Sequence, residues 1–92
     1  MYKKKYYIQY LEEEDAGLIN NIILKPRNGF YIWSQCKGIA DDGDYMDSMV
    51  FKFGDANGSS ENLTKEINDA LLEEVKNEFR EIKEYYEITE YS

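Results

Sequence analysis

Four aspartates, Asp41, Asp42, Asp44 and Asp47, stand within seven positions of the chain, with no base among them. Carboxylate oxygens are the ligands that Ca²⁺ and Mg²⁺ prefer, and carboxyl groups can also act as general acids and bases. A calcium loop that began at Asp42 would have Asp44 at its third position but Met46 at its fifth, where an oxygen ligand is needed. The spacing therefore favours a solvated acidic loop or a protein-binding surface over a calcium site.

A second partial calcium pattern begins at Asp55 and has Glu66 at its twelfth position. A calcium loop needs glycine at the sixth position, and Ser60 stands there instead. The segment before Asp55 is also typical of a strand, whereas a calcium loop follows a helix. We therefore predict a turn here, with Ser60 or a neighbour as the cap of a following helix.

Other catalytic groups are scarce. The 92 residues contain no histidine, which removes the commonest general base and metal ligand. The single thiol, Cys36, has Lys37 beside it but no histidine to activate it, so we expect a small half-buried residue. We expect a protein that is not an enzyme and holds no cofactor. A divalent-metal-dependent enzyme built on the aspartates is the least favoured alternative.

Length and composition indicate one folded domain, residues 1–92. A content of 42% hydrophobic and 15% aromatic residues provides enough apolar surface for a modest core. A lone cysteine cannot form an internal disulfide, and the sequence contains no apolar run long enough to span a membrane. We therefore expect a cytoplasmic protein.

The formal net charge is −8, and residues 61–92 carry ten acids against four bases. Binding to nucleic acid or to an anionic membrane requires Lys and Arg side chains that neutralise phosphates. The charge of the whole chain therefore argues against direct contact with nucleic acid or membrane and favours a basic protein partner. Solubility alone is the competing explanation of the acidic surface.

The first half of the chain shows two strand-like patterns. Residues 4–11 alternate, with Tyr6, Ile8 and Tyr10 on one face, as in a strand. Residues 18–25 contain a short apolar run that fits either a strand or a helix, and we favour a strand because Gly17 and two asparagines weaken the helix.

A tight turn is predicted at residues 26–29, where Asn28 and Gly29 can take left-handed conformations. It would fold residues 30–35 back on the preceding strand as a hairpin. Residues 48–53 alternate again, with Met49, Phe51 and Phe53 on one side, which predicts a further strand.

The second half contains a long amphipathic helix, predicted from about residue 60 to residue 85. Its apolar residues recur every three or four positions: Leu63, Ile67, Leu71, Val75, Phe79, Ile82 and Tyr86. The tail, residues 85–92, is either a frayed end or a short added strand. The predicted fold is therefore an α+β domain, in which an antiparallel three- to four-stranded meander packs against one long C-terminal amphipathic helix.

The predicted partner-binding residues are the acids of the first turn, the aspartate loop and the long helix. They are Glu12, Glu13, Glu14, Asp15, Asp41, Asp42, Asp44, Tyr45, Asp47, Glu73, Glu74, Glu81 and Glu84. Aromatic residues exceed what one buried sheet face can hold, which predicts an exposed strip that includes Tyr2, Tyr7, Tyr31, Trp33 and Tyr45. Such a strip would also suit a homodimer interface.

Together these features predict a small acidic protein-binding module that blocks the basic nucleic-acid-binding groove of a partner, with carboxylates standing where phosphates would. Small acidic proteins encoded by phages, including DNA mimics and inhibitors of CRISPR nucleases, are similar in size and charge. The codon usage implied by abundant Ile, Asn, Lys, Tyr and Glu indicates an AT-rich genome, as in a low-GC bacterium or its phage. An immunity protein that neutralises a basic toxin and a structural homo-oligomer subunit are the alternatives.

Overall fold

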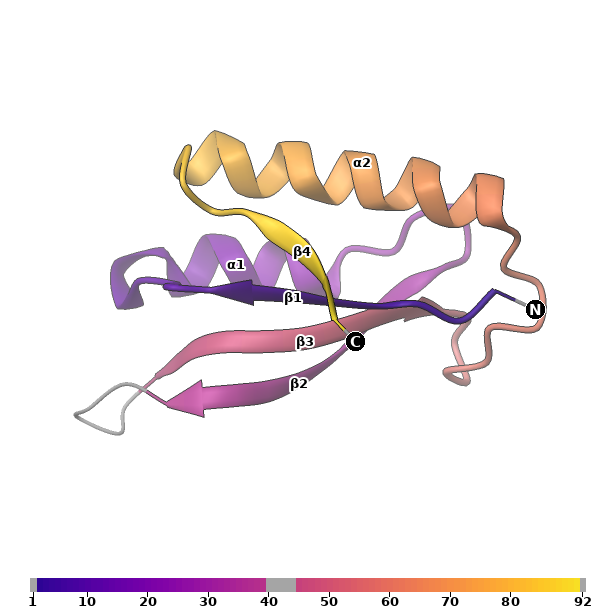
Figure 1. Ribbon diagram of the computed structural model, residues 1–92, viewed down its shortest axis with the longest axis horizontal. Coiled ribbons are helices and arrows are strands. Elements are labelled where there is room, and N and C mark those ends of the chain that lie inside the picture. Colours follow the sequence, from indigo (N-terminus) through magenta and orange to yellow (C-terminus); the bar gives the residue numbers. More distant parts are fainter. Residues whose placement is uncertain (1, 40–44, 92) are drawn as a thin grey trace.

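The computed structural model describes residues 2–39 and 45–91. Its elements are, in chain order, β1 (Lys5–Gln9), the 3₁₀ turn η1 (Glu13–Asp15), α1 (Ala16–Leu24), β2 (Tyr31–Ile39), β3 (Met46–Gly54), α2 (Lys65–Ile82) and β4 (Ile88–Tyr91) (Figure 1). The α+β class and the antiparallel sheet are confirmed. The described part of the chain contains no helix that is both long enough and apolar enough to cross a membrane.

The four strands form one antiparallel sheet in the order β2-β3-β1-β4. The predicted meander is wrong, because β1 lies between β3 and β4 instead of beside β2. Tyr6 of β1 pairs with Phe51 of β3, and Ile8 pairs with Met49 on one side and Ile88 on the other. Strand order depends on such pairings between segments distant in the chain. With its two helices the chain has the β-α-β-β-α-β, ferredoxin-like topology.

The core lies between one face of the sheet and both helices. The strands contribute Tyr6, Ile8, Ile32, Met49, Phe51, Phe53 and Ile88, and the helices contribute Ile19, Ile22, Leu71, Val75 and Phe79. Figure 1 shows α2 running along one side of the sheet. Because both helices share this core, the opposite face of the sheet has no helix over it.

Residues 18–24 form most of α1, so the strand predicted at residues 18–25 is wrong. Ile19 and Ile22, three residues apart, are both buried against the core, and Ile23 packs against its edge. This spacing is the one by which the sequence also fitted a helix, the alternative to the favoured strand. Burial of each isoleucine stabilises the fold by about 1.5–3 kcal/mol. The two together exceed the roughly 1 kcal/mol by which Gly17 destabilises a helix.

The turn at residues 26–29 is confirmed, but the hairpin that it was expected to form is wrong. Asn28 and Gly29 both have positive φ angles, 53° and 83°, and Arg27 and Phe30 exchange backbone hydrogen bonds of 2.8 and 2.9 Å. The turn leads from α1 into β2. The buried Arg27 side chain binds Glu78 of α2 through both carboxylate oxygens, at 3.0 Å from Nη2, and so attaches the turn to the long helix.

The long helix is shorter than predicted at both ends. Thr64, four residues after the predicted cap, accepts a hydrogen bond from the N–H of Ile67 at 3.2 Å. Ser60 donates instead to the carbonyl of Phe53, at 3.2 Å. At the other end, residues 88–91 form the edge strand β4, which settles the two alternatives for the tail.

One face assignment within β1 also fails. Tyr6 and Ile8 share one face, as predicted, and are buried, but Tyr10 is 70% exposed. The strand ends at Gln9, and Tyr10 has a positive φ of 63°, so the alternation of faces stops there.

Candidate functional site

Three segments that are distant in the sequence meet at one end of the molecule. The N–H of Leu11 donates to the carbonyl of Asp47 at 2.9 Å, which places the turn after β1 beside the start of β3. The N–H of Glu12 donates to the hydroxyl of Tyr86 at 2.9 Å, which places the same turn beside the segment after α2. We call residues 12–15, 45–47 and 81–86 the acidic end.

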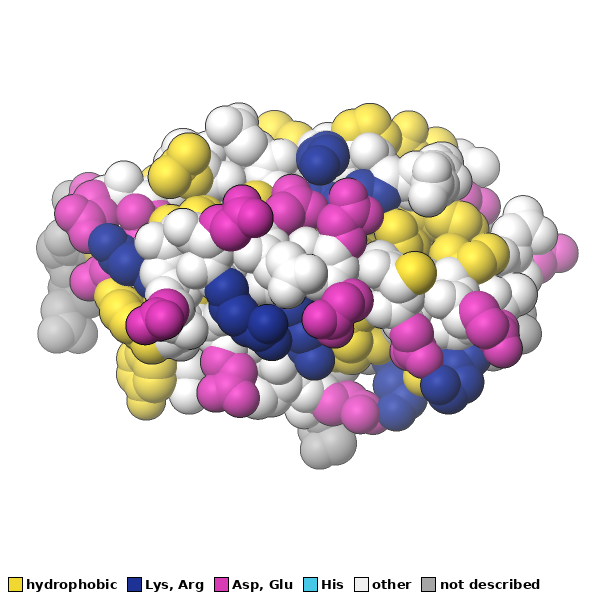
Figure 2. All heavy atoms as spheres, turned by 90° about the horizontal axis from the view of Figure 1, so that it is seen from above, with side chains coloured by type: hydrophobic (Ala, Val, Ile, Leu, Met, Phe, Trp, Pro, Cys, Tyr) yellow, Lys and Arg dark blue, Asp and Glu magenta, His cyan; other side chains and the backbone are white. Residues whose placement is uncertain are grey.

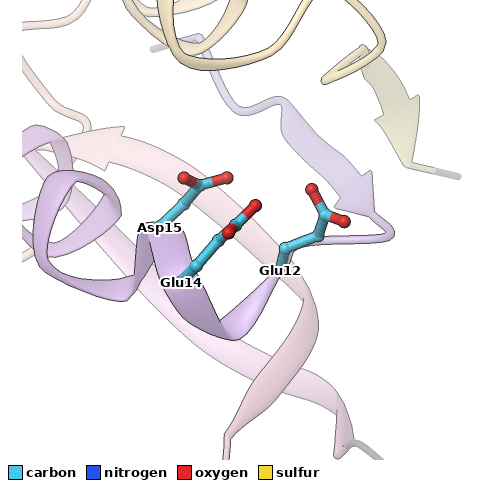
Figure 3. A group of neighbouring side chains, drawn as sticks. All are labelled: Glu12, Glu14 and Asp15. Atoms are coloured by element: carbon cyan, nitrogen blue, oxygen red, sulfur yellow. The ribbon is translucent and has the colours of Figure 1, made fainter.

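Lys83 holds three carboxylates of the acidic end together. Its ammonium group lies 2.9 Å from Glu14, 3.7 Å from Glu12 and 3.8 Å from Asp15. The three carboxylates point to the same side of the turn (Figure 3), and their nearest oxygens lie within 4.8 Å of one another. The hydrogen bond with Glu14 raises the pKa of Lys83, because it favours the charged ammonium.

Three clustered carboxylates could also hold a metal ion. In this cluster the lysine ammonium already supplies the positive charge, and it would have to move before a divalent cation could bind. We therefore interpret the contact of Lys83 with the three carboxylates as structural, because it joins the turn at residues 12–15 to the end of α2.

Asp15 and Tyr86 form the buried part of this contact. The Tyr86 hydroxyl donates to the Asp15 carboxylate at 2.6 Å, and both side chains are buried. Burial is the main cause that raises the pKa of Tyr86, and the hydrogen bond to Asp15 raises it further. The neighbouring Tyr85 hydroxyl donates to the Glu12 carboxylate. Glu12 and Asp15 are thus engaged within the protein.

The acidic end also presents carboxylates that are not engaged. Glu13, Glu81 and Glu84 are exposed, and their side chains form no hydrogen bond or ion pair with another described residue. Asp47 is half-buried and accepts a hydrogen bond from Ser48 at 3.3 Å. These side chains could bind a basic partner without breaking a contact that holds the fold.

Tyr45 also belongs to this end. It lines, with Glu12, Ala16, Ile19, Asn20 and Met46, a hollow of about 180 Å³. An aromatic ring beside carboxylates is a common feature of protein-binding surfaces. The predicted contacts Asp41, Asp42 and Asp44 lie outside the described residues.

Two predicted contacts are not part of the acidic end. Glu73 and Glu74 lie farther back along α2, and Glu74 faces Lys25 at 3.8 Å and Arg27 at 3.9 Å. Figure 2, which looks onto the side of the molecule where α2 lies, shows Asp and Glu side chains among Lys and Arg. The acids on this part of the helix are therefore partly neutralised by neighbours.

The partial calcium pattern at residue 55 is a turn, as predicted. One carboxylate oxygen of Asp55 accepts the N–H groups of Asn57 at 2.8 Å and Ser59 at 3.0 Å. This oxygen closes the turn and explains why an aspartate stands first in the pattern.

Sequence reasoning missed a second surface on the uncovered side of the sheet. Its residues are Lys5, Tyr7, Trp33, Lys37, Lys52 and Tyr91, which we call the open sheet face. Tyr7 and Trp33 belong to the predicted aromatic strip, but Tyr91 and the lysines were not predicted to join them. The available signal was that Lys5 and Tyr7, and likewise Val50 and Lys52, stand two residues apart and therefore share one face of their strand. What brings them together is the pairing of distant strands.

Comparisons of the chain with protein-family models, with curated proteins and with solved structures give no match.

Proposed function

We propose that this protein is a non-enzymatic binding module whose acidic end docks on a basic, nucleic-acid-binding protein and blocks the groove that phosphates would occupy. One observation carries the proposal: three segments that carry acids, far apart in sequence, converge on one end, and three carboxylates from two of these segments are exposed and unengaged.

Charge complementarity is the physical basis of this proposal. Opposite surface potentials speed the encounter of two proteins and disfavour partners of the same charge. Internal contacts made by Glu12, Glu14 and Asp15 fix the backbone of the turn, so Glu13 is presented from a rigid support. Rigid presentation lowers the entropy lost on binding.

An affinity-capture experiment tests the proposed function. The tagged protein is incubated with a lysate of a low-GC bacterium, washed at stepped salt and then challenged with double-stranded DNA. The expected result is a basic nucleic-acid-binding protein that is retained at low salt and released both by salt and by DNA.

The DNA challenge separates the proposal from its alternatives. A basic toxin bound at a surface other than a nucleic-acid groove would leave with salt but stay bound when DNA is added. A homo-oligomer subunit would capture only its own copies and would elute above its monomer mass in size-exclusion chromatography. Either result would contradict the proposed function.

A further inference from the structure

The open sheet face contains a row of four side chains, one from each strand, with an aromatic residue at each end and two lysines between them. Trp33 on β2 pairs with Lys52 on β3, and Lys5 on β1 pairs with Tyr91 on β4. The β1–β3 register, with Tyr6 opposite Phe51, puts Lys5 opposite Lys52. Both lysines line one cavity of about 390 Å³.

Two lysines directly opposite each other disfavour the sheet, because like charges on neighbouring strands repel. The Lys5 side chain is exposed and forms no hydrogen bond or ion pair with another described residue, and the Lys52 ammonium donates to the carbonyl of Gly58 at 2.9 Å. Such a departure from local rules is expected where a surface serves binding.

One aromatic ring of this face lies beside a further cation. The Lys37 ammonium, from edge strand β2, lies 5.3 Å from the ring centroid of Tyr91 on the opposite edge strand. The rings of Tyr7 and Tyr91 lie 6.2 Å apart. Trp33 and Tyr91 remain 43% and 39% exposed. Accessible rings therefore lie at the two edges of the sheet, with ammonium groups between them.

Carboxylates are few around the row. Glu90 lines the same cavity as the two lysines but is paired with Lys4, and the Asp55 carboxylate closes its own turn. Glu87 lies toward the other end of the face, where it lines a different hollow with Tyr7 and Tyr85. The outward positions of the described parts of the four strands carry no carboxylate in this row.

We propose that the open sheet face binds single-stranded nucleic acid. Phosphates would be neutralised by Lys5, Lys37 and Lys52, and unpaired bases would stack on Trp33 and Tyr91, a combination that recurs in proteins that bind single strands. A duplex presents its bases stacked inside and cannot use the rings, whereas an acidic peptide can use the lysines but offers no base to stack.

The negative charge of the whole chain does not prevent this binding. At physiological salt the Debye length is about 8 Å, so a bound strand responds mainly to the charges nearest to it. The domain extends 39 by 23 by 22 Å, and the acidic outer surface of α2 lies on the far side of the core from the open sheet face. The expectation of no direct contact with nucleic acid rested on the summed charge alone.

Trp33 is the only tryptophan in the chain, so its fluorescence reports directly on this face. The test titrates the full-length protein with oligothymidylate of about 12 nucleotides and follows Trp33 quenching together with anisotropy of a labelled strand. We expect saturable quenching, weaker binding of a duplex of equal length, and a plot of log K against log salt with a slope of about −2 from three lysines.

Two double variants separate the face from the overall charge. The first double variant combines Lys5→Glu with Lys52→Glu, and the second combines Lys65→Glu with Lys76→Glu. Each variant changes the net charge from −8 to −12, because each substitution lowers the charge by two units. The first pair is expected to weaken binding about tenfold or more, and the second, on α2, by less than about twofold. Tyr91→Ser is expected to weaken binding about fivefold while leaving the salt slope unchanged. Circular dichroism melting confirms that each variant is folded.

Three outcomes would overturn the proposal. The first is no quenching and no anisotropy change with oligonucleotide up to about 100 µM at low salt. The second is equal loss of binding in the two double variants, which would assign the effect to net charge. The third is equal binding of polyglutamate, which would assign the face to acidic peptides. None of these outcomes depends on whether the acidic end binds a basic protein.

Discussion

At the scale of single residues, the acidic end is held together by contacts that the sequence pattern does not reveal. The run of four acids at residues 12–15 has the composition of a solvated turn. In the structure Asp15 is buried and bound by Tyr86, and Glu14 is bound by Lys83. Their partners lie 71 and 69 positions away in the chain, so only the tertiary structure separates these acids from the exposed Glu13.

Tyr86 gives a prediction about pH. Phe in place of Tyr86 leaves the buried Asp15 carboxylate and the Glu12 N–H without their partner, and we expect it to lower the free energy of unfolding by about 2–3 kcal/mol at pH 7. The pKa of Tyr86 is raised in the folded state, so the wild-type contribution is fully present below the unfolded pKa of about 10.

Above that pH the unfolded wild-type chain ionises first, and its stability falls by about 1.4 kcal/mol per pH unit from this group. The difference between wild type and Y86F should therefore be constant from pH 7 to pH 9 and shrink above pH 10. Urea unfolding of both proteins across this range measures it. A difference that stays constant above pH 10 would contradict the assignment.

Asn68 and Tyr6 give a second prediction. Asn68 is fully buried and its Nδ2 donates to the Tyr6 hydroxyl at 2.6 Å, while its Oδ1 has no partner among the described residues. Each single substitution, Tyr6→Phe or Asn68→Leu, leaves one polar group unpaired and should cost about 1–3 kcal/mol. The double variant removes both, together with the unpaired oxygen.

We expect the double variant Y6F/N68L to be as stable as wild type or more so. A double-mutant cycle by chemical denaturation measures the coupling between the two positions. Additive losses in the double variant would show that the two side chains do not act as a pair.

At the scale of elements, periodicity predicts long segments well and short ones poorly. The helix α2 is 18 residues long and its apolar stripe identifies it, whereas the apolar run of α1 is too short to separate a strand from a helix. Asn28 and Gly29 predict their turn correctly because its backbone conformation is local. The hairpin prediction required a strand before the turn, and it is wrong because that segment is the helix α1.

Replacing either of two glycines, Gly17 or Gly29, by alanine is predicted to change stability in opposite directions. Gly17 lies in the first turn of α1 with open space around its Cα, and its φ is not positive. Gly17→Ala should therefore raise stability by about 0.4–1 kcal/mol, or a few degrees in Tm. Gly29 also has open space but a φ of +83°, so Gly29→Ala should lower stability by about 1–2 kcal/mol.

Thermal melting of both variants measures the contrast. Because neither added methyl group meets a neighbour, opposite signs would show that backbone conformation decides the outcome. A loss of stability in G17A would contradict the placement of residues 16–24 in a helix.

At the scale of the whole molecule, charge is distributed unevenly. Acids converge at the end formed by residues 12–15, 45–47 and 81–86, and lysines gather with aromatic rings on the open sheet face. The sequence reveals the runs of acids by composition, and the binding role given to them stays a prediction. It could not predict the lysine row, because Lys5 and Lys52 become neighbours only through the pairing of β1 with β3.

The most direct test of the proposed function is the association rate of the captured basic partner with charge-reversed variants. Glu13→Lys with Glu84→Lys changes two exposed acids of the acidic end, and Glu61→Lys with Glu66→Lys makes the same charge change near the start of α2, a helix length of about 27 Å away. The proposal predicts that the first pair slows association about tenfold at low salt while the second changes it by less than about twofold. Equal rates for the two pairs would contradict the acidic end as the docking surface.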